Sequence, residues 1–147
     1  MKQNARKVLN ELLVDIFNKI LTLEERFHRV HGVKLTMSEI HTLEGIQKSE
    51  SKMMSDVASL LSITQGTLTV TINRLSHKGY VNRTQDTKDR RIYRLGLSEK
   101  GEEVMKIHNQ FHEDMVDRLL LHLSDKDEHL IDSLEEINVF FKELYEI

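Results

Sequence analysis

One segment, residues 55–97, restricts the fold more than any other part of this 147-residue chain. Within it, Leu68, Ile72 and Leu75 are separated by four and then three residues, the spacing of a helix that buries a single face. Thr64 precedes this helix as a suitable N-cap, because its hydroxyl can accept a hydrogen bond from a free backbone N–H of the first turn. A shorter helical pattern lies just before it, so the segment predicts a helix-turn-helix.

A β-hairpin is predicted directly after the second helix. Gly79 stands where a helix commonly ends in positive φ. Residues 80–84 and 91–97 are rich in β-branched, aromatic and other apolar residues, and the polar residues between them make a connection longer than a two-residue turn. Within this connection, Asp89 can hold a neighbouring guanidinium by a charge-assisted pair. A basic hairpin beside an exposed helix is the arrangement of a wing, which can insert an arginine into the minor groove of DNA.

The outer face of the second helix carries short hydroxyls, amides and a guanidinium, which can reach phosphates and base edges. Taken alone, such a face is also typical of ordinary solvated surface, and the basic hairpin is what favours DNA. Gly66 removes a side chain in the first turn, where backbone can approach a phosphate closely. The residues predicted to bind DNA are Thr64, Gln65, Thr67, Thr69, Asn73, Arg74, Lys88, Arg90 and Arg91.

Charge is distributed unevenly along the chain, although the net value is only −3. Residues 51–100 hold nine Lys and Arg against four Asp and Glu, a net charge of +5, whereas residues 101–147 hold four against thirteen, a net charge of −9. A basic segment that coincides with the predicted helix-turn-helix and wing is the electrostatic pattern of a nucleic-acid-binding protein.

Long amphipathic helices are predicted on both sides of this segment. Residues 7–31 repeat apolar side chains in alternating steps of four and three, as in a coiled coil, with further apolar residues beside the seam. Additional helices are expected near residues 37–48, 98–123 and 125–147, and the chain contains no proline to interrupt them. The predicted fold class is mainly α with a small β-hairpin wing. Residues 1–35 and 98–147 are predicted to form a helical dimerisation region, and residues 36–97 the winged helix-turn-helix, within one compact protomer of a homodimer.

Several other classes of protein are disfavoured. The chain has no cysteine, which excludes a disulfide framework and a thiolate zinc site. It has neither an apolar run of membrane-spanning length nor the apolar core of a signal peptide, so we expect a cytoplasmic protein. No phosphate-binding loop or nucleophile motif is present, so we expect a binding protein that is not an enzyme and needs no cofactor. A helical protein–protein adaptor that does not bind DNA stays open as an alternative.

The order of LLSITQGTLTVTINRLSHKGYVNR and then DTKDRRIYRLGLSEKG resembles the winged-helix core of the MarR family of bacterial regulators. Within that family, EIHTLEGI, QGTLTVTINRLSHKGYV and IHNQFHEDMV are similar to the repressors of fatty-acid biosynthesis genes in Gram-positive bacteria. Val70 departs from the family pattern, since a basic residue is common there. The resemblance implies a homodimeric repressor of a pseudo-palindromic operator that responds to acyl carrier protein bearing a long acyl chain.

An effector pocket is predicted where the apolar faces of the flanking helices meet. The same residues also fit a plain core, so both interpretations stay open. The predicted lining residues are Phe17, Ile20, Leu21, His41, His108, Phe111, His112 and Met115.

A zinc-responsive repressor is the alternative for the same region. His108 and His112 are four residues apart, so both rings lie on one face of a helix, a common spacing for two ligands of one zinc ion. The resemblance implies that Glu24 and His41 complete such a site, as in zinc-responsive repressors of the family. A lone pair of histidines at this spacing is a weak motif, and lining a cavity or pairing with Glu24 would also account for them.

Overall fold

The structure, a computed structural model, describes residues 2–145. The chain divides into two compact units, residues 1–37 and 38–147, which are described separately. None of the helices within residues 2–145 combines the length and the apolar character that crossing a membrane requires. The predicted fold class is confirmed, because the described chain is mainly helical with one two-stranded antiparallel hairpin and has long helices at both ends.

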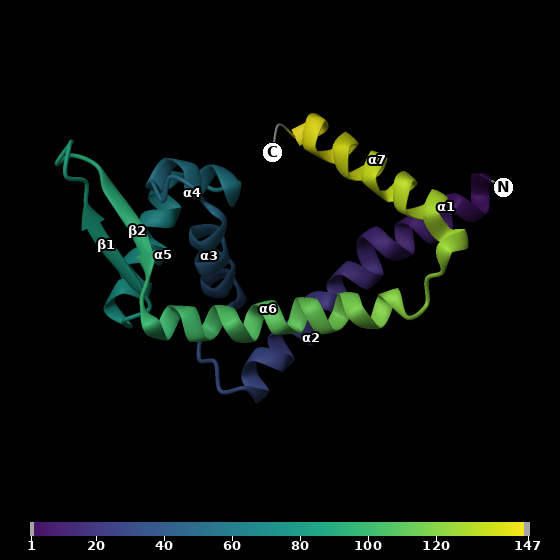
Figure 1. Ribbon diagram of the computed structural model, residues 1–147, viewed down its shortest axis with the longest axis horizontal. Helices are drawn as coiled ribbons and strands as arrows, with labels where there is room; N and C mark the ends of the chain where they lie inside the picture. The colour runs from purple at the N-terminus through teal and green to yellow at the C-terminus, as the bar shows by residue number, and fades with distance from the viewer. Residues whose placement is uncertain (1, 146–147) are drawn as a thin grey trace. The chain divides into compact units, whose positions relative to one another are not determined.

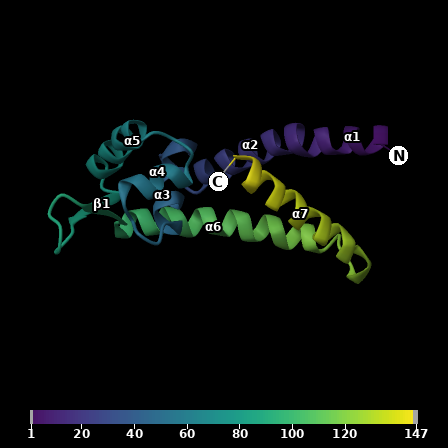
Figure 2. The same cartoon turned by 90° about the horizontal axis from the view of Figure 1, so that it is seen from above.

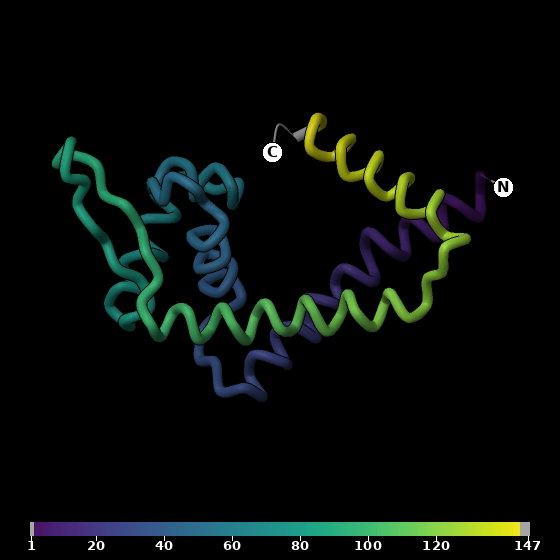
Figure 3. Tube along the Cα trace, viewed as in Figure 1, coloured from purple at the N-terminus to yellow at the C-terminus, as the bar shows by residue number. Residues whose placement is uncertain are grey.

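The first unit is one continuous helical run, traced in Figure 3 from the N-terminus. It consists of α1 (Lys2–Asn10), a π-helical segment η1 (Glu11–Ile16) and α2 (Phe17–Val30). The run begins five residues earlier than the apolar repeat predicts, since the polar residues before it contain no helix breaker. It ends at Val30, within one residue of the predicted end, and Gly32 follows with a φ of +77°. The π-helical segment was not predicted, because the repeat fits regular helical spacing throughout.

The second unit contains the predicted helix-turn-helix and hairpin. Its elements are α3 (Met37–Lys48, which begins one residue before the boundary), α4 (Met54–Leu60), α5 (Gln65–His77), β1 (Val81–Gln85), β2 (Tyr93–Leu97), α6 (Glu99–Leu120), the 3₁₀ turn η2 (Asp125–Asp127) and α7 (Glu128–Tyr145). Figures 1 and 2 show α3, α4 and α5 gathered beside the N-terminal half of α6, with the hairpin at the start of that helix.

The core of the second unit lies among α3, α4, α5, the hairpin and the start of α6. Each of these elements contributes at least one buried apolar side chain, and burying one such side chain stabilises the fold by about 1.5–3 kcal/mol. The predicted stripe of α5 is confirmed as fully buried. The main core residues are Ile40, Leu43, Ile46, Val57, Leu68, Ile72, Leu75, Leu95, Val104 and Met105.

Local capping signals fix where the later helices begin. Ser98 is the N-cap of α6, since its hydroxyl accepts a hydrogen bond from the backbone N–H of Gly101. Ser124 and Asp127 form a capping box ahead of α7, and these bonds lower the pKa of the Asp127 carboxyl. In contrast to the core, α7 keeps most of its apolar side chains exposed, among them Leu134 and Leu144, at 47% and 55%.

Candidate nucleic-acid interface

The turn between α4 and α5 presents α5 as an exposed helix. Ser62 adopts a φ of +53°, which reverses the chain after α4, and the backbone N–H of Ile63 bonds to the Ala58 carbonyl at 3.0 Å. Thr64 then caps α5, with its hydroxyl oxygen accepting from the backbone N–H of Thr67 at 3.2 Å. The predicted helix-turn-helix and its N-cap are therefore present.

The outward direction of α5 is set by its buried stripe. At 3.6 residues per turn, the positions opposite Leu68, Ile72 and Leu75 lie about half a turn away. All of the predicted residues of this helix are exposed, but Thr67 and Thr69 lie at the sides of the outward face, and Gln65 lies nearer to the buried stripe. The outward face itself carries Gly66, Val70, Asn73, Arg74 and His77, all exposed. Neither Val70 nor His77 was predicted to bind DNA, although the helical wheel places both on this face.

Threonine hydroxyls at the start of α5 are engaged in hydrogen bonds within the helix and its cap. The hydroxyl of Thr69 donates to the Gln65 carbonyl at 2.8 Å, and the hydroxyls of Thr64 and Thr67 lie 2.9 Å apart. What Thr69 offers outward is therefore a methyl group and oxygen lone pairs. Asn73 is different, because its side-chain oxygen accepts a hydrogen bond from Arg83 on β1. Arg83 was not among the residues predicted to bind DNA.

The hairpin is fastened to the helix-turn-helix through β2. Its two strands pair from Val81 with Leu97 to Gln85 with Tyr93. The backbone N–H of Leu95 donates to the Lys52 carbonyl at 2.8 Å, which joins β2 to the connection before α4. This bond holds the wing to the body that carries α5.

Two carboxylates shape the tip of the hairpin. Asp86 accepts hydrogen bonds from the backbone N–H groups of Asp89, at 3.1 Å, and Lys88, at 2.8 Å, and from the Arg94 guanidinium, at 3.0 Å. These hydrogen bonds lower the pKa of Asp86, and the bond from the backbone N–H of Asp89 is the largest cause. The predicted pairing of Asp89 with a guanidinium is confirmed, since Nε and Nη2 of Arg91 each lie 3.1 Å from its carboxylate. That pair lowers the pKa of Asp89.

The carboxylates of Asp86 and Asp89 therefore hold the hairpin tip in shape, while the side chains exposed to solvent there are mainly basic. Lys88, Arg90 and Arg91 are all exposed at the tip. A guanidinium held by one carboxylate keeps donors on its remaining edge, which suits contact with phosphate or with base edges of the minor groove.

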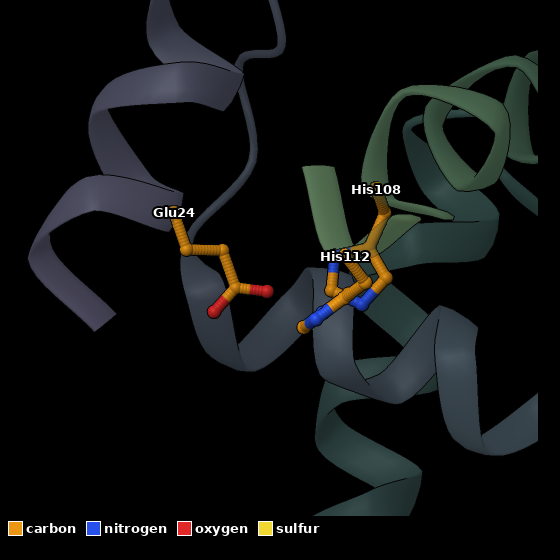
Figure 4. A group of neighbouring side chains, drawn as sticks. All are labelled: Glu24, His108 and His112. Carbon is orange, nitrogen blue, oxygen red and sulfur yellow. The ribbon is translucent and has the colours of Figure 1, made fainter. Parts of the chain in front are cut away.

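A second group of polar residues lies where α3 and α6 meet, inside the second unit. The rings of His108 and His112 have centroids 4.6 Å apart, and His41 lies 5.9 Å from His108. Figure 4 shows His108 and His112 side by side on α6. Nε2 of His108 is 3.6 Å from the Glu44 carboxylate, whose other oxygen pairs with Lys48 at 2.5 Å.

The environment of Glu44 favours its charged form. The His108 imidazole beside the carboxylate is the largest cause, and Lys48 adds to it, so the pKa of Glu44 is lowered from 4.5 to about 2 despite partial burial. Because the folded pKa is below the ordinary value, this group stabilises the fold above pH 4.5. The contribution is lost as the pH falls from 4.5 towards 2.

The residues predicted to line an effector pocket belong to both units. Phe17, Ile20 and Leu21 lie on α2 in the first unit. Phe111 and Met115 lie on α6 and are half-buried, and the ring of Phe111 lies 5.5 Å from that of His112. Glu24 also belongs to the first unit. The pocket stays a prediction.

An exposed helix after a tight turn, followed by a hairpin with a basic tip, defines this chain as a winged helix-turn-helix protein. Residues 35–93 match the model of the MarR family. The chain belongs to the MarR family of transcriptional regulators, which confirms the resemblance predicted from the sequence.

Three comparisons illustrate the family relationship. The chain is 31% identical to FabT of Streptococcus pneumoniae, solved in complex with DNA, with a TM-score of 0.84 over 95% of this chain and 99% of that one. It is 28% identical to the transcriptional regulator AdcR of Streptococcus pyogenes over 92% of this chain and 97% of the relative. It is also 27% identical to the transcriptional repressor MdtR of Bacillus subtilis, over 65% of each protein, so that match spans less than two thirds of the relative.

Proposed function

We propose that this protein is a sequence-specific DNA-binding transcriptional repressor that acts as a homodimer. The observation that carries the proposal is the exposed α5, with its polar outward face beside a hairpin whose tip presents Lys88, Arg90 and Arg91. In this proposal α5 enters the major groove and the hairpin tip reaches the adjacent minor groove. Similarity to a MarR-family protein solved with DNA supports it.

The dimer is proposed from the apolar surface that one protomer leaves exposed. Val116, Leu119 and Leu120 at the end of α6 are about half exposed, as are Leu134 and Leu144 of α7. So many large apolar side chains at one end of a chain mark an interaction surface. A second copy would bury them, and its twofold axis would place two α5 helices on half-sites about one helical turn of DNA apart.

Acyl carrier protein bearing a long acyl chain is proposed as the effector. The resemblance of EIHTLEGI, QGTLTVTINRLSHKGYV and IHNQFHEDMV to repressors of fatty-acid biosynthesis suggests this effector, and Phe111 and Met115 offer half-buried apolar side chains on α6. Each CH₂ group of the chain that becomes buried adds roughly 0.8 kcal/mol to binding. Longer chains should therefore act more strongly until the available space is filled. The effector regulates only if it binds one spacing of the two α5 helices better than another.

A zinc-responsive repressor is the second candidate, because His108 and His112 have adjacent rings and His41 lies close by. Nitrogen donors from neighbouring turns of a helix suit zinc. The resemblance to zinc-responsive repressors of the family adds Glu24, on α2, to this proposed ligand set. The similarity to AdcR covers nearly the whole of both chains.

The test begins with selection of binding sites from a library of randomised duplexes, followed by affinity measurements on the selected duplex over a range of salt. We expect a palindromic site and a steep fall in affinity, with each neutralised phosphate contributing roughly −0.9 to the log–log slope. A protein that retains no duplex at low salt would be the helical adaptor instead.

The effector is identified on the same duplex. Affinity is measured with long-chain acyl carrier protein, short-chain acyl carrier protein, and zinc with and without a chelator. A response to the long acyl chain alone supports the first candidate. A response to zinc alone, abolished by His108→Ala and by His112→Ala in variants that remain folded by circular dichroism, supports the second.

A further inference from the structure

One contact joins the recognition helix directly to the wing. Asn73 stands on the outward face of α5, and Nη2 of Arg83, on β1, donates to its side-chain oxygen at 2.5 Å. Both side chains are exposed, so neither contributes to the core.

The chemistry of this contact fixes the orientation of the amide. A guanidinium carries only donors, so the atom of Asn73 that faces it must be the oxygen and not the nitrogen. The two ends of a planar amide point in different directions, and an asparagine without such a partner can turn either end outward. With Arg83 in place, the NH₂ group of Asn73 is the end directed away from β1.

We propose that Asn73 reads a purine through its NH₂ group and that Arg83 is the residue that positions it. In the major groove, N7 of both adenine and guanine is an acceptor at the same place on the base edge, whereas cytosine presents a donor and thymine presents its O4 acceptor at a different place, beside its methyl group. A fixed NH₂ donor at the middle of the recognition helix therefore selects a purine at one position of each half-site. This inference rests on the proposed DNA-binding function.

A positioning role for Arg83 differs measurably from a phosphate contact. A phosphate contact raises affinity for every sequence alike and carries no sequence information. Loss of the positioning residue instead lets the Asn73 amide turn, so the preference at a single base pair weakens while the rest of the selected site stays the same. The effect must also depend on Asn73, because Arg83 acts through it.

The experiment combines five proteins with two kinds of duplex. The parent chain, Arg83→Ala, Asn73→Ala and the double variant each select sites from the randomised library, and each is then titrated with duplexes carrying 7-deazapurine at single positions. Lys88→Ala is the comparator, because it also removes one positive charge from the hairpin, but at the tip and away from Asn73. Circular dichroism is used to check that each variant is folded, which we expect because the substituted side chains are exposed.

For the parent, 7-deaza substitution at one purine of each half-site should weaken binding by about three- to tenfold, the value of one neutral hydrogen bond. Asn73→Ala should abolish that sensitivity, and Arg83→Ala should weaken both it and the purine preference at the same position. The double variant should match Asn73→Ala in its preference, and Lys88→Ala should lower affinity with the parental preference intact.

Two results would overturn the inference while leaving the proposed function in place. One is a selected site whose preferences survive Arg83→Ala, with affinity lowered evenly for all sequences. The other is sensitivity to 7-deazapurine that persists in Asn73→Ala. If the parent selects no site at all, the proposed function itself fails.

Discussion

Substitution of Gly101 by alanine should stabilise the protein if helix propensity dominates and destabilise it if the close backbone contact dominates. Gly101 lies in the first turn of α6, where helix propensity alone favours alanine by about 1 kcal/mol. The backbone leaves no room for it, because a Cβ added at Gly101 would lie closer than 3.0 Å to the carbonyl oxygen of Tyr80. That oxygen accepts the backbone N–H of Ser98 at 3.0 Å, at the junction between the hairpin and α6.

The size of the effect follows from what must move. The neighbouring atom is backbone and not the end of a flexible side chain, so the junction has to open, which typically costs about 1–3 kcal/mol. Weakening the bond from Ser98 to Tyr80 adds about 0.5–1.5 kcal/mol. After the gain in helix propensity is subtracted, Gly101→Ala should lower the free energy of unfolding by about 1–3 kcal/mol.

Urea unfolding followed by circular dichroism measures this value. Gly66→Ala is the matched control, because Gly66 is also in the first turn of a helix and an added Cβ would only reach Thr64 at 3.9 Å. It should be neutral or stabilising by up to about 1 kcal/mol. If Gly101→Ala proves as stable as the parent chain, the packing of α6 against the hairpin base is not as described.

Three further predictions concern the wing, the dimer and pH. Arg91→Ala should weaken binding to the selected duplex by about 1–3 kcal/mol in an anisotropy titration, and an unchanged affinity would remove Arg91 from the interface. Leu134→Asp should give a folded monomer in sedimentation, since 47% of this side chain is exposed in one protomer; a dimer of parental affinity would exclude α7 from the interface. Glu44→Gln should lower the free energy of unfolding at pH 7 by about 1–2 kcal/mol, a value discounted for partial exposure. The loss should shrink between pH 4.5 and 2, because the fold favours only the charged form of Glu44, as its lowered pKa shows. Equal losses at pH 7 and pH 2 would contradict that origin.

Local signals account for what the sequence predicted well. Thr64, Ser98 and Gly79 act on backbone within a few residues, so their roles as caps follow from residue type and position. The buried stripe of α5 follows from periodicity in the same way. Asp89 and Arg91 are neighbours in sequence, which made their pairing predictable.

Contacts between residues that are far apart in the sequence could not be predicted from such local signals. The need for glycine at position 101 is one such case, because nothing in its own helix reveals that the Tyr80 carbonyl lies against it. The contact of Arg83 with Asn73 depends on how the hairpin stands beside α5. Val70 is a different case, since the helical wheel places it on the outward face and only its apolar character led to its omission.

Directed cleavage of DNA tests the central claim most directly. The chain contains no cysteine, so a single introduced cysteine can carry an iron–EDTA reagent at one known place. Thr69→Cys on α5, Lys88→Cys at the hairpin tip and Lys142→Cys on α7 are compared on the selected duplex. The account predicts cuts inside each half-site from α5, cuts in the flanking minor groove from the hairpin tip, both repeated about the twofold axis, and none from α7. Cuts from α7 with none from α5 or the hairpin would contradict it.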